Sequence, residues 1–294
     1  MSKTDFLDLP AGFRDPERAA VAILPVPYDG TSTWKKGADR GPAAILEASA
    51  QLELYDIETA TEPYRHGITT LGEVGSQGSP EEVADVVAAR AGAILDRGQL
   101  PVILGGEHSV SIGAIRAAAG RFPRLSVLQI DAHADTRDAY DGSSHNHACV
   151  MARARELCPV VQVGIRSVDT SEIDRLDRER VFWAHEINDD DSWMARVVDL
   201  LTEEVYVTVD LDAFDPSLIP ATGTPEPDGL SWRQVNRLLA EVARARRVIG
   251  FDVVELLPQP GDHACDFLAA KLVYRFLAMI FASDGFVASP GADD

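Results

Sequence analysis

The chain has 294 residues, of which 46% are hydrophobic, so it can bury a sizeable core and is not expected to be disordered. Its 47 acidic and 27 basic residues give a net charge of −20, which argues against nucleic acid or an anionic membrane as a partner. The sequence has no apolar run long enough to suggest a membrane span, and its three cysteines show no CxxC spacing, which favours a reduced, cytoplasmic protein.

Short apolar segments alternate with helical patterns along the chain. The apolar, β-prone runs predict strands over 21–25, 67–71, 101–104, 125–130, 160–163, 181–183, 205–209 and 248–254. Helical patterns, some opened by a serine cap or a proline, predict helices over 42–54, 80–96, 111–120, 189–202, 231–244 and 267–281. Because alternating strands and helices indicate a parallel sheet covered on both faces, we expect one three-layer α/β/α domain spanning 1–294, with about eight strands.

The strand predicted over 125–130 ends in an unusual polar stretch. Asp131, His133 and Asp135 alternate there with two alanines. In an extended chain, residues i, i+2 and i+4 point to the same side, so this spacing directs two carboxylates and an imidazole toward one point. A buried strand that ends in this way predicts half of a two-metal site.

Two further strand ends carry potential ligands. His108 follows Gly105-Gly106, where the glycines allow a tight exit from the strand and a close approach of the backbone. Asp210 and Asp212 come at the end of the strand predicted over 205–209. Since sites in open parallel sheets form at the carboxyl ends of the strands, we expect these side chains to meet those of the first group.

Together the three strand ends supply four aspartates and two histidines. Four carboxylates gathered without cations would repel one another and shift toward protonation. Two divalent ions would neutralise them, and an oxygen-rich ligand set with some imidazole suits Mn²⁺ better than Zn²⁺. The pattern therefore predicts two Mn²⁺ ions per subunit.

Several motifs resemble the signatures of the ureohydrolases, a family of arginases, agmatinases and related guanidino-acid hydrolases. The resemblance runs from about Val21 through the final helix and rests on Gly37-Ala-Asp-Arg-Gly-Pro42, Gly-Gly-Glu-His108-Ser, Asp131-Ala-His-Ala-Asp135, Asp210-Leu-Asp-Ala-Phe-Asp-Pro-Ser217 and Pro220-Ala-Thr-Gly-Thr-Pro225. It implies an eight-stranded parallel sheet, a dinuclear Mn²⁺ centre and assembly into a homotrimer or homohexamer.

The resemblance also assigns the ligands to the two metals. It implies that His108 and Asp135 bind one ion and that His133 and Asp212 bind the other. The remaining two ligands, Asp131 and Asp210, would bridge both ions.

Three further residues match positions that act on the substrate. His147 matches the active-site histidine that assists proton transfer, with the nearby His145 as a competing candidate. Glu255, at the end of an otherwise apolar strand, matches the carboxylate that pairs with the guanidinium, and Thr224 would add a hydrogen bond to the same group. Among the metal ligands, Asp135 would also orient the attacking hydroxide and pass its proton to the leaving amine.

The loop before His147 bears on the choice of substrate. Asp138 and Asp141 there would repel a carboxylate and attract a terminal amine, although Arg137 lies beside them. That favours a small cationic substrate, agmatine, which would be cleaved to putrescine and urea. A sibling activity on guanidinobutyrate, guanidinopropionate, aminopropylagmatine, arginine or a formimino compound remains an alternative. An inactive metal-binding scaffold is a further alternative, against which the complete ligand set counts.

Overall fold

Eight parallel strands form one sheet, which confirms the predicted fold class. The computed structural model describes residues 5–187 and 191–283. The strands are β1 (Val21–Val26), β2 (Ile68–Thr70), β3 (Leu100–Gly105), β4 (Leu125–Ile130), β5 (Val160–Ile165), β6 (Val181–Trp183), β7 (Glu204–Asp210) and β8 (Arg247–Val254). Their order in the sheet is β2-β1-β3-β8-β7-β4-β5-β6.

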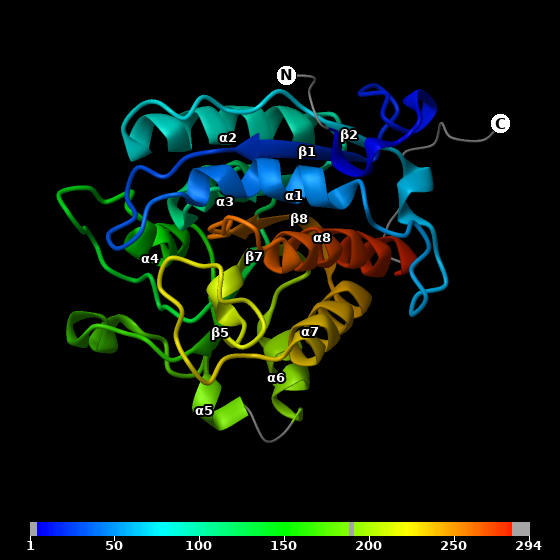
Figure 1. Cartoon of the computed structure of the whole chain (residues 1–294). Coiled ribbons are helices and arrows are strands. Elements are labelled where there is room, and N and C mark those ends of the chain that lie inside the picture. The colour runs from blue at the N-terminus through cyan, green and yellow to red at the C-terminus, as the bar shows by residue number, and fades with distance from the viewer. Residues whose placement is uncertain (1–4, 188–190, 284–294) are drawn as a thin grey trace.

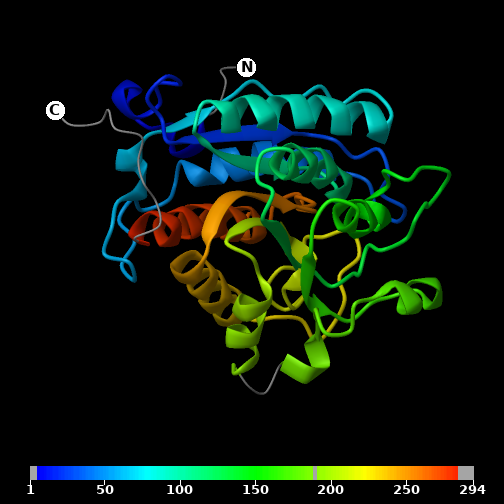
Figure 2. The same ribbon diagram turned by 180° about the vertical axis from the view of Figure 1, so that it is seen from behind.

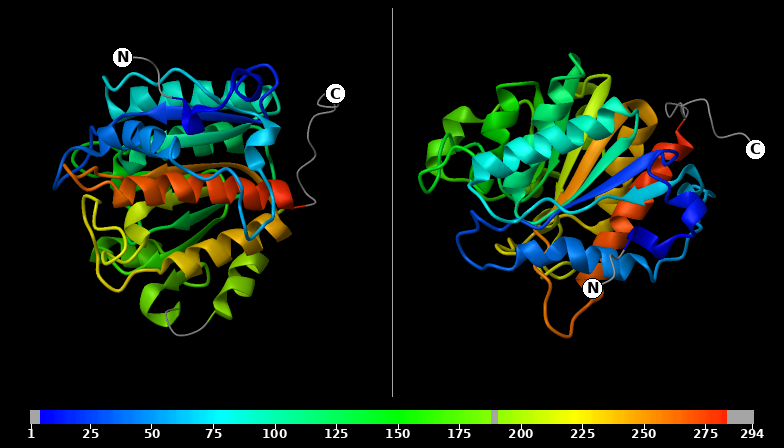
Figure 3. Two further views of the ribbon diagram at one scale, coloured as in Figure 1. Left: turned by 45° about the vertical axis from the view of Figure 1, so that its right-hand side comes forward. Right: turned by 90° about the horizontal axis from the view of Figure 1, so that it is seen from above.

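Helices cover both faces of the sheet, so the apolar strands are buried on both sides. One layer consists of α1 (Gly41–Ser49), α8 (Ala264–Ala282), α7 (Trp232–Ala245) and α6 (Trp193–Leu200), which pack in that order (Figure 1). The opposite layer consists of α2 (Pro80–Asp96), α3 (Ser111–Ala119) and α4 (Val150–Arg155) (Figure 2). The view from above in Figure 3 shows the twisted sheet between the two layers. A short helix, α5 (Ala184–Ile187), follows β6.

Several helix ends follow from local sequence chemistry. The Ser79 and Ser231 side chains each accept a hydrogen bond from the backbone three residues later, and Glu82 and Gln234 bond back, so both predicted starts are capping boxes. None of the helices in the described ranges combines the length and apolar character that a membrane crossing requires.

Three helix predictions differ from the structure. The helix predicted over 42–54 ends at Ser49, whose hydroxyl donates to the Leu46 carbonyl and accepts a hydrogen bond from the Leu7 amide. Helix α4, which buries Val150 and Met151, lies in a region for which no helix was predicted. The helix predicted over 189–202 is observed as Trp193–Leu200, and residues 189–190 lie outside the described residues.

The register of the central strands aligns their carboxyl ends. Ile130 of β4 pairs with Val209 of β7, and Asp210 pairs with Val254 of β8. Asp131, Asp210 and Glu255 therefore leave the sheet at nearly the same level, and the ends of four adjacent strands, β3, β8, β7 and β4, converge on one place.

Candidate metal centre and active site

A cavity of about 280 Å³ opens at the carboxyl ends of the central strands. His108 follows β3, Glu255 follows β8, Asp210 ends β7 and Asp135 lies in the segment after β4, and all four line the cavity. The cavity lies where an open parallel sheet forms its ligand sites. Side chains far apart in the sequence are thus brought together by strand order and register.

The exit from β3 depends on Gly106. A Cβ atom at this position would lie 2.0 Å from the carbonyl oxygen of Tyr28, so no larger residue fits. The chain is held against the loop after β1 because the Glu107 amide donates to the same Tyr28 carbonyl at 2.9 Å. His108 then begins a short 3₁₀ turn with its side chain directed into the cavity, as the glycine pair predicted.

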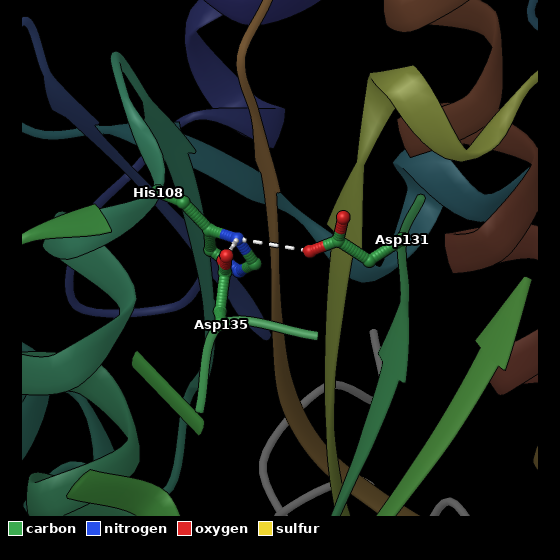
Figure 4. A group of neighbouring side chains, drawn as sticks. All are labelled: His108, Asp131 and Asp135. Atoms are coloured by element: carbon green, nitrogen blue, oxygen red, sulfur yellow. Dashed lines mark ion pairs between the residues drawn. The ribbon is translucent and has the colours of Figure 1, made fainter. Parts of the chain in front are cut away.

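The ring of His108 faces three carboxylates. Its Nδ1 lies 3.0 Å from Asp135 Oδ2 and 3.2 Å from Asp131 Oδ2 (Figure 4). Asp210 Oδ2 lies 3.5 Å from the same nitrogen. Although His108 is fully buried, Nδ1 has no hydrogen-bond partner in the part of the chain that the structure describes. A buried nitrogen surrounded by carboxylate oxygens, without a hydrogen bond to them, is the arrangement expected of a metal ligand.

The hydrogen bond of the other ring nitrogen, Nε2, determines which nitrogen of His108 carries the proton. Nε2 lies 2.9 Å from Thr208 Oγ1, and the Thr208 hydroxyl donates to Asp252 Oδ1 at 2.6 Å. Since the hydroxyl hydrogen is already used, Nε2 must donate to Thr208, which leaves a lone pair on Nδ1. That lone pair points at the three carboxylates, and a cation between them would relieve the repulsion.

A second group of ligand atoms adjoins the first. His133 Nδ1 lies 3.0 Å from Asp212 Oδ2 and 3.7 Å from Asp131 Oδ1. Each group, His108 with Asp131 and Asp135 or His133 with Asp131 and Asp212, offers three ligand atoms within 4.8 Å of one another and could hold an ion. Asp131 is shared by both groups, whereas Asp210 approaches His108.

Burial and crowding shift the protonation of these groups. Burial, followed by the charge of Asp212, raises the pKa of Asp210 well above its usual value. Burial and the neighbouring Asp131 raise the pKa of Asp135 to about 7. Burial opposes a charge on His133, but Asp212 and Asp131 outweigh it and raise its pKa. Without metal ions, therefore, protons partly replace the missing positive charge, and divalent cations would displace them.

Two cavity residues hold a strained backbone. Asp135 and Glu255 have φ angles of 53° and 66°, in the left-handed region that residues other than glycine seldom adopt. Such strain concentrates at functional sites. The segment after β4 is therefore not the extended chain that the alternation predicted, yet Asp131 and Asp135 still meet at His108 Nδ1 because the backbone turns at Asp135.

Glu255 lies beside the metal-ligand candidates. Its Oε1 accepts a hydrogen bond from the His108 amide at 2.8 Å, while its own amide donates to the Gly106 carbonyl. Burial, followed by the charge of Glu107, raises the pKa of Glu255 well above its usual value. A buried carboxylate of this kind is costly unless a cation faces it, so the arrangement suits a positively charged substrate.

The remaining predicted residues separate into those in the cavity and those outside it. His147 and Thr224 line the cavity, whereas His145 does not and instead lies 3.9 Å from Glu81. Asp215 braces its own loop, because it accepts hydrogen bonds from the Ser217 hydroxyl and from the amides of Ser217 and Gly229, which lower its pKa to about 2.

The outer wall of the cavity corrects one sequence-based expectation. Asp138 forms ion pairs with Arg175 and Arg153, and neither Asp138 nor Asp141 lines the cavity. The expectation that these two acids attract the far end of the substrate was therefore wrong. A paired acid on the surface is already compensated, and the loop directs its other residues inward.

Acids from a different loop line that wall. Asp169 and Glu172 lie after β5, with Arg137 at 3.8 and 3.7 Å from their carboxylates and stacked over the ring of Tyr140. The exposed ring of Trp34, from the loop after β1, completes the wall. Sequence reasoning missed these residues because single polar or aromatic residues in loops carry no periodic signal.

Comparisons with known proteins agree with this geometry. Residues 19–279 match the model of the arginase family. The chain is 39% identical to an N(1)-aminopropylagmatine ureohydrolase from Synechocystis, over 88% of each chain, and 33% identical to an agmatinase from Pyrococcus horikoshii, over 90% of this chain and 93% of that one. The crystal structure of the agmatine ureohydrolase of Thermoplasma volcanium superimposes with a TM-score of 0.87 at 32% identity and 96% coverage of both chains.

The family model covers nearly the whole chain, and relatives above 30% identity span about nine tenths of it. The resemblance inferred from the motifs is thereby confirmed. The chain belongs to the arginase family and is a hydrolase that acts on guanidino compounds.

Proposed function

We propose that this protein uses two Mn²⁺ ions to hydrolyse agmatine to putrescine and urea. The observation that carries the proposal is the meeting, in one cavity at the strand ends, of two metal-ligand groups with the buried Glu255. A metal centre beside a buried carboxylate that no cationic side chain neutralises in the described residues suits hydrolysis of a substrate that brings its own positive charge.

The metal ligands in this proposal are the six that the motifs predict. His108 and Asp135 would hold one ion, His133 and Asp212 would hold the other, and Asp131 and Asp210 would serve both. The lone pair on His108 Nδ1 and the sharing of Asp131 between the two groups support this division. Two divalent ions would lower the pKa of a water molecule and so supply the nucleophile at neutral pH.

Glu255 holds the guanidinium in the proposed reaction. A carboxylate and a guanidinium form paired, charge-assisted hydrogen bonds that fix both position and plane. Since Oε1 of Glu255 is already oriented by the His108 amide, the side chain is fixed before the substrate arrives. Thr224, which lines the cavity, adds a hydrogen bond to the same group.

Proton transfer falls to Asp135 and His147. Water adds to the guanidinium carbon, the bond from this carbon to the alkyl nitrogen breaks, and that nitrogen must gain a proton to leave as an amine. Asp135 orients the nucleophile and passes on the proton. His147, which also lines the cavity, assists.

Agmatine is proposed because Asp169 lines the wall and keeps 45% of its side chain exposed beside Arg137, so this acid, in place of the two first expected, can face a terminal amine. N(1)-aminopropylagmatine is the second candidate, since relatives with 39–40% identity are ureohydrolases of that compound. Both substrates share a guanidinium and a cationic tail without a carboxylate.

Urea release by the full-length chain tests the proposal. Mn²⁺-loaded and chelated protein are compared on agmatine, N(1)-aminopropylagmatine, arginine and guanidinobutyrate. We expect metal-dependent release, with the highest kcat/KM on agmatine. A higher value on N(1)-aminopropylagmatine would select the second candidate, and a best value on a carboxylate-bearing substrate would overturn both.

Assembly into a homotrimer or homohexamer and a cytoplasmic location stay predictions from the resemblance and the sequence. Light scattering on the Mn²⁺-loaded chain measures the first.

A further inference from the structure

Thr31 joins the active-site histidine to a buried carboxylate. Its hydroxyl oxygen lies 3.0 Å from His147 Nδ1, donates to Glu107 Oε2 at 2.9 Å and accepts a hydrogen bond from the His147 amide at 3.0 Å. Thr31 comes from the loop after β1 and is 116 residues from His147 in the chain. No motif had singled it out.

The hydrogen bonds of this threonine can be counted completely. A hydroxyl has one hydrogen to donate and two lone pairs to accept with. The hydrogen is given to Glu107, and one lone pair is taken by the His147 amide. Only a lone pair is left for His147 Nδ1, so that nitrogen must carry the proton and donate it.

Glu107 is held as an acceptor. It is fully buried and receives hydrogen bonds from the Ser109 amide at 2.9 Å and the Ser109 hydroxyl at 2.6 Å, in addition to that from Thr31. All three partners donate, which satisfies a carboxylate and fixes its orientation. Because Glu107 accepts, Thr31 must be the donor in the hydrogen bond between them.

The ring of His147 is also fixed sterically. The rings of Tyr140 and His147 pack at right angles, edge to face, with 6.2 Å between centroids. Nε2 has no hydrogen-bond partner within residues 5–187 and 191–283, and His147 lines the cavity. With the proton on Nδ1, the nitrogen left for the cavity is an acceptor.

We propose that Thr31 is a positioning residue that holds His147 in the Nδ1-protonated tautomer, so that the Nε2 lone pair is offered to the substrate guanidinium. The proposal rests on the function proposed above and deepens it. A guanidinium presents only N–H donors, so an acceptor nitrogen attracts it, whereas the opposite tautomer would set donor against donor.

The electrostatics of His147 agree with a neutral ring. Burial is the main cause that lowers the pKa of His147 to about 4. A neutral imidazole adds no positive charge next to a cationic substrate. The tautomer then decides how the ring contacts that substrate.

The tautomer is measured directly by nitrogen NMR. The full-length protein is labelled with [¹⁵N]histidine and loaded with Zn²⁺, whose filled d shell leaves the signals unbroadened. His147→Asn identifies the signal pair of this residue. We expect the wild type to show a protonated Nδ1 and an unprotonated Nε2, and Thr31→Val to show a mixture of the two tautomers.

Kinetics with Mn²⁺-loaded protein give the matching functional readout. Thr31→Val removes the hydroxyl at nearly constant volume and should lower kcat about 10- to 100-fold, the range found when the outer partner of a metal-binding histidine is removed, with KM changed much less. Thr31→Ser restores a hydroxyl and should recover most of the activity. Thr59→Val, which removes a threonine hydroxyl bonded to Asp56 outside the cavity, serves as the control and should keep wild-type kinetics.

The outcomes separate this proposal from the proposed function. A wild-type signal with the proton on Nε2 would overturn the role of Thr31, even if urea is released and even if Thr31→Val does not fold. Loss of activity in both Thr31→Val and Thr31→Ser, with an unchanged tautomer, would overturn it as well. If no guanidino compound yields urea, the proposed function fails, while the tautomer is still measured because it needs no turnover.

Discussion

The floor and the wall of the cavity are built in different ways. The cavity floor, defined as His108, Asp131, His133, Asp135, Asp210 and Asp212, lies at the ends of hydrogen-bonded strands and is largely buried. The cavity wall, defined as the lining residues of 32–35, 137–148, 167–172 and 223–224, comes from loops and includes Trp34 with 73% of its surface exposed.

This difference suggests that the floor carries out the reaction and that the wall selects the substrate. Strand register positions the floor, as a metal centre requires, and Asp131 is held there by hydrogen bonds from Gln129 and the His133 amide. Loops tolerate exchange of their side chains without loss of the sheet, so the wall is where related enzymes can differ in the substrates they accept.

Asp131→Asn is expected to have the largest effect, because it removes a charge shared by both ligand groups. Metal content should fall, and kcat/KM should fall by more than about 100-fold, beyond the range of outer-partner substitutions. Elemental analysis and urea release measure the two effects. Asp85→Asn, an exposed acid on α2 paired with Arg116, serves as the control. Full metal content in the Asp131→Asn protein would show that Asp131 is not a metal ligand.

Glu255→Gln tests the point where floor and wall meet. The amide oxygen still accepts from the His108 amide, so metal content should stay unchanged. Loss of a charge-assisted hydrogen bond costs about 1.5–3 kcal/mol, which corresponds to a decrease in kcat/KM of about 10- to 100-fold. Glu203→Gln, an exposed residue paired with Arg124, is the matched control. If metal were lost and the residual turnover per metal stayed normal, Glu255 would belong to the metal ligands instead.

The sequence made the floor predictable and left most of the wall undetermined. Asp131 to Asp135 and Asp210 to Asp212 are short, local patterns that follow strands with a clear apolar signal, so fold and ligands could both be inferred. Thr31 could not be found in this way, because its partners Glu107 and His147 are 76 and 116 residues away. Loop residues meet only after the sheet has set its topology.

The same reason explains the wrong expectation for Asp138. Its position beside the active-site loop was clear from the sequence, but its ion pairs with Arg153 and Arg175 depend on how two loops pack. A charged loop residue bears on substrate choice only when it is known whether its side chain faces the cavity.

Metal binding to the floor should depend on pH. In the metal-free protein the pKa of Asp135 is raised to about 7, so below that pH the group holds a proton that the metal must displace. The apparent affinity for metal should therefore rise with pH up to about 7, by up to about tenfold per pH unit for one proton. Above that pH, Asp135 should make no further contribution to the rise. Titration calorimetry in buffers of different ionisation enthalpy measures the protons released. Equal affinity at pH 5.5 and 7 would contradict the raised pKa.

Asp169→Asn should give the smallest effect and tests the wall alone. The carboxylate is 45% exposed and is shared with Arg137, so solvent screens its attraction for a substrate amine. An exposed charge pair contributes about 0.2–1 kcal/mol, so KM for agmatine should rise no more than about fivefold while kcat and metal content stay unchanged. For guanidinobutyrate, which carries a carboxylate in place of the amine, KM should fall rather than rise in this variant. Asp138→Asn, outside the cavity, should change neither substrate's KM. A specific contact between Asp169 and the amine requires that only Asp169→Asn raises KM for agmatine. An equal rise in both variants would instead mean that the wall acts through its overall charge.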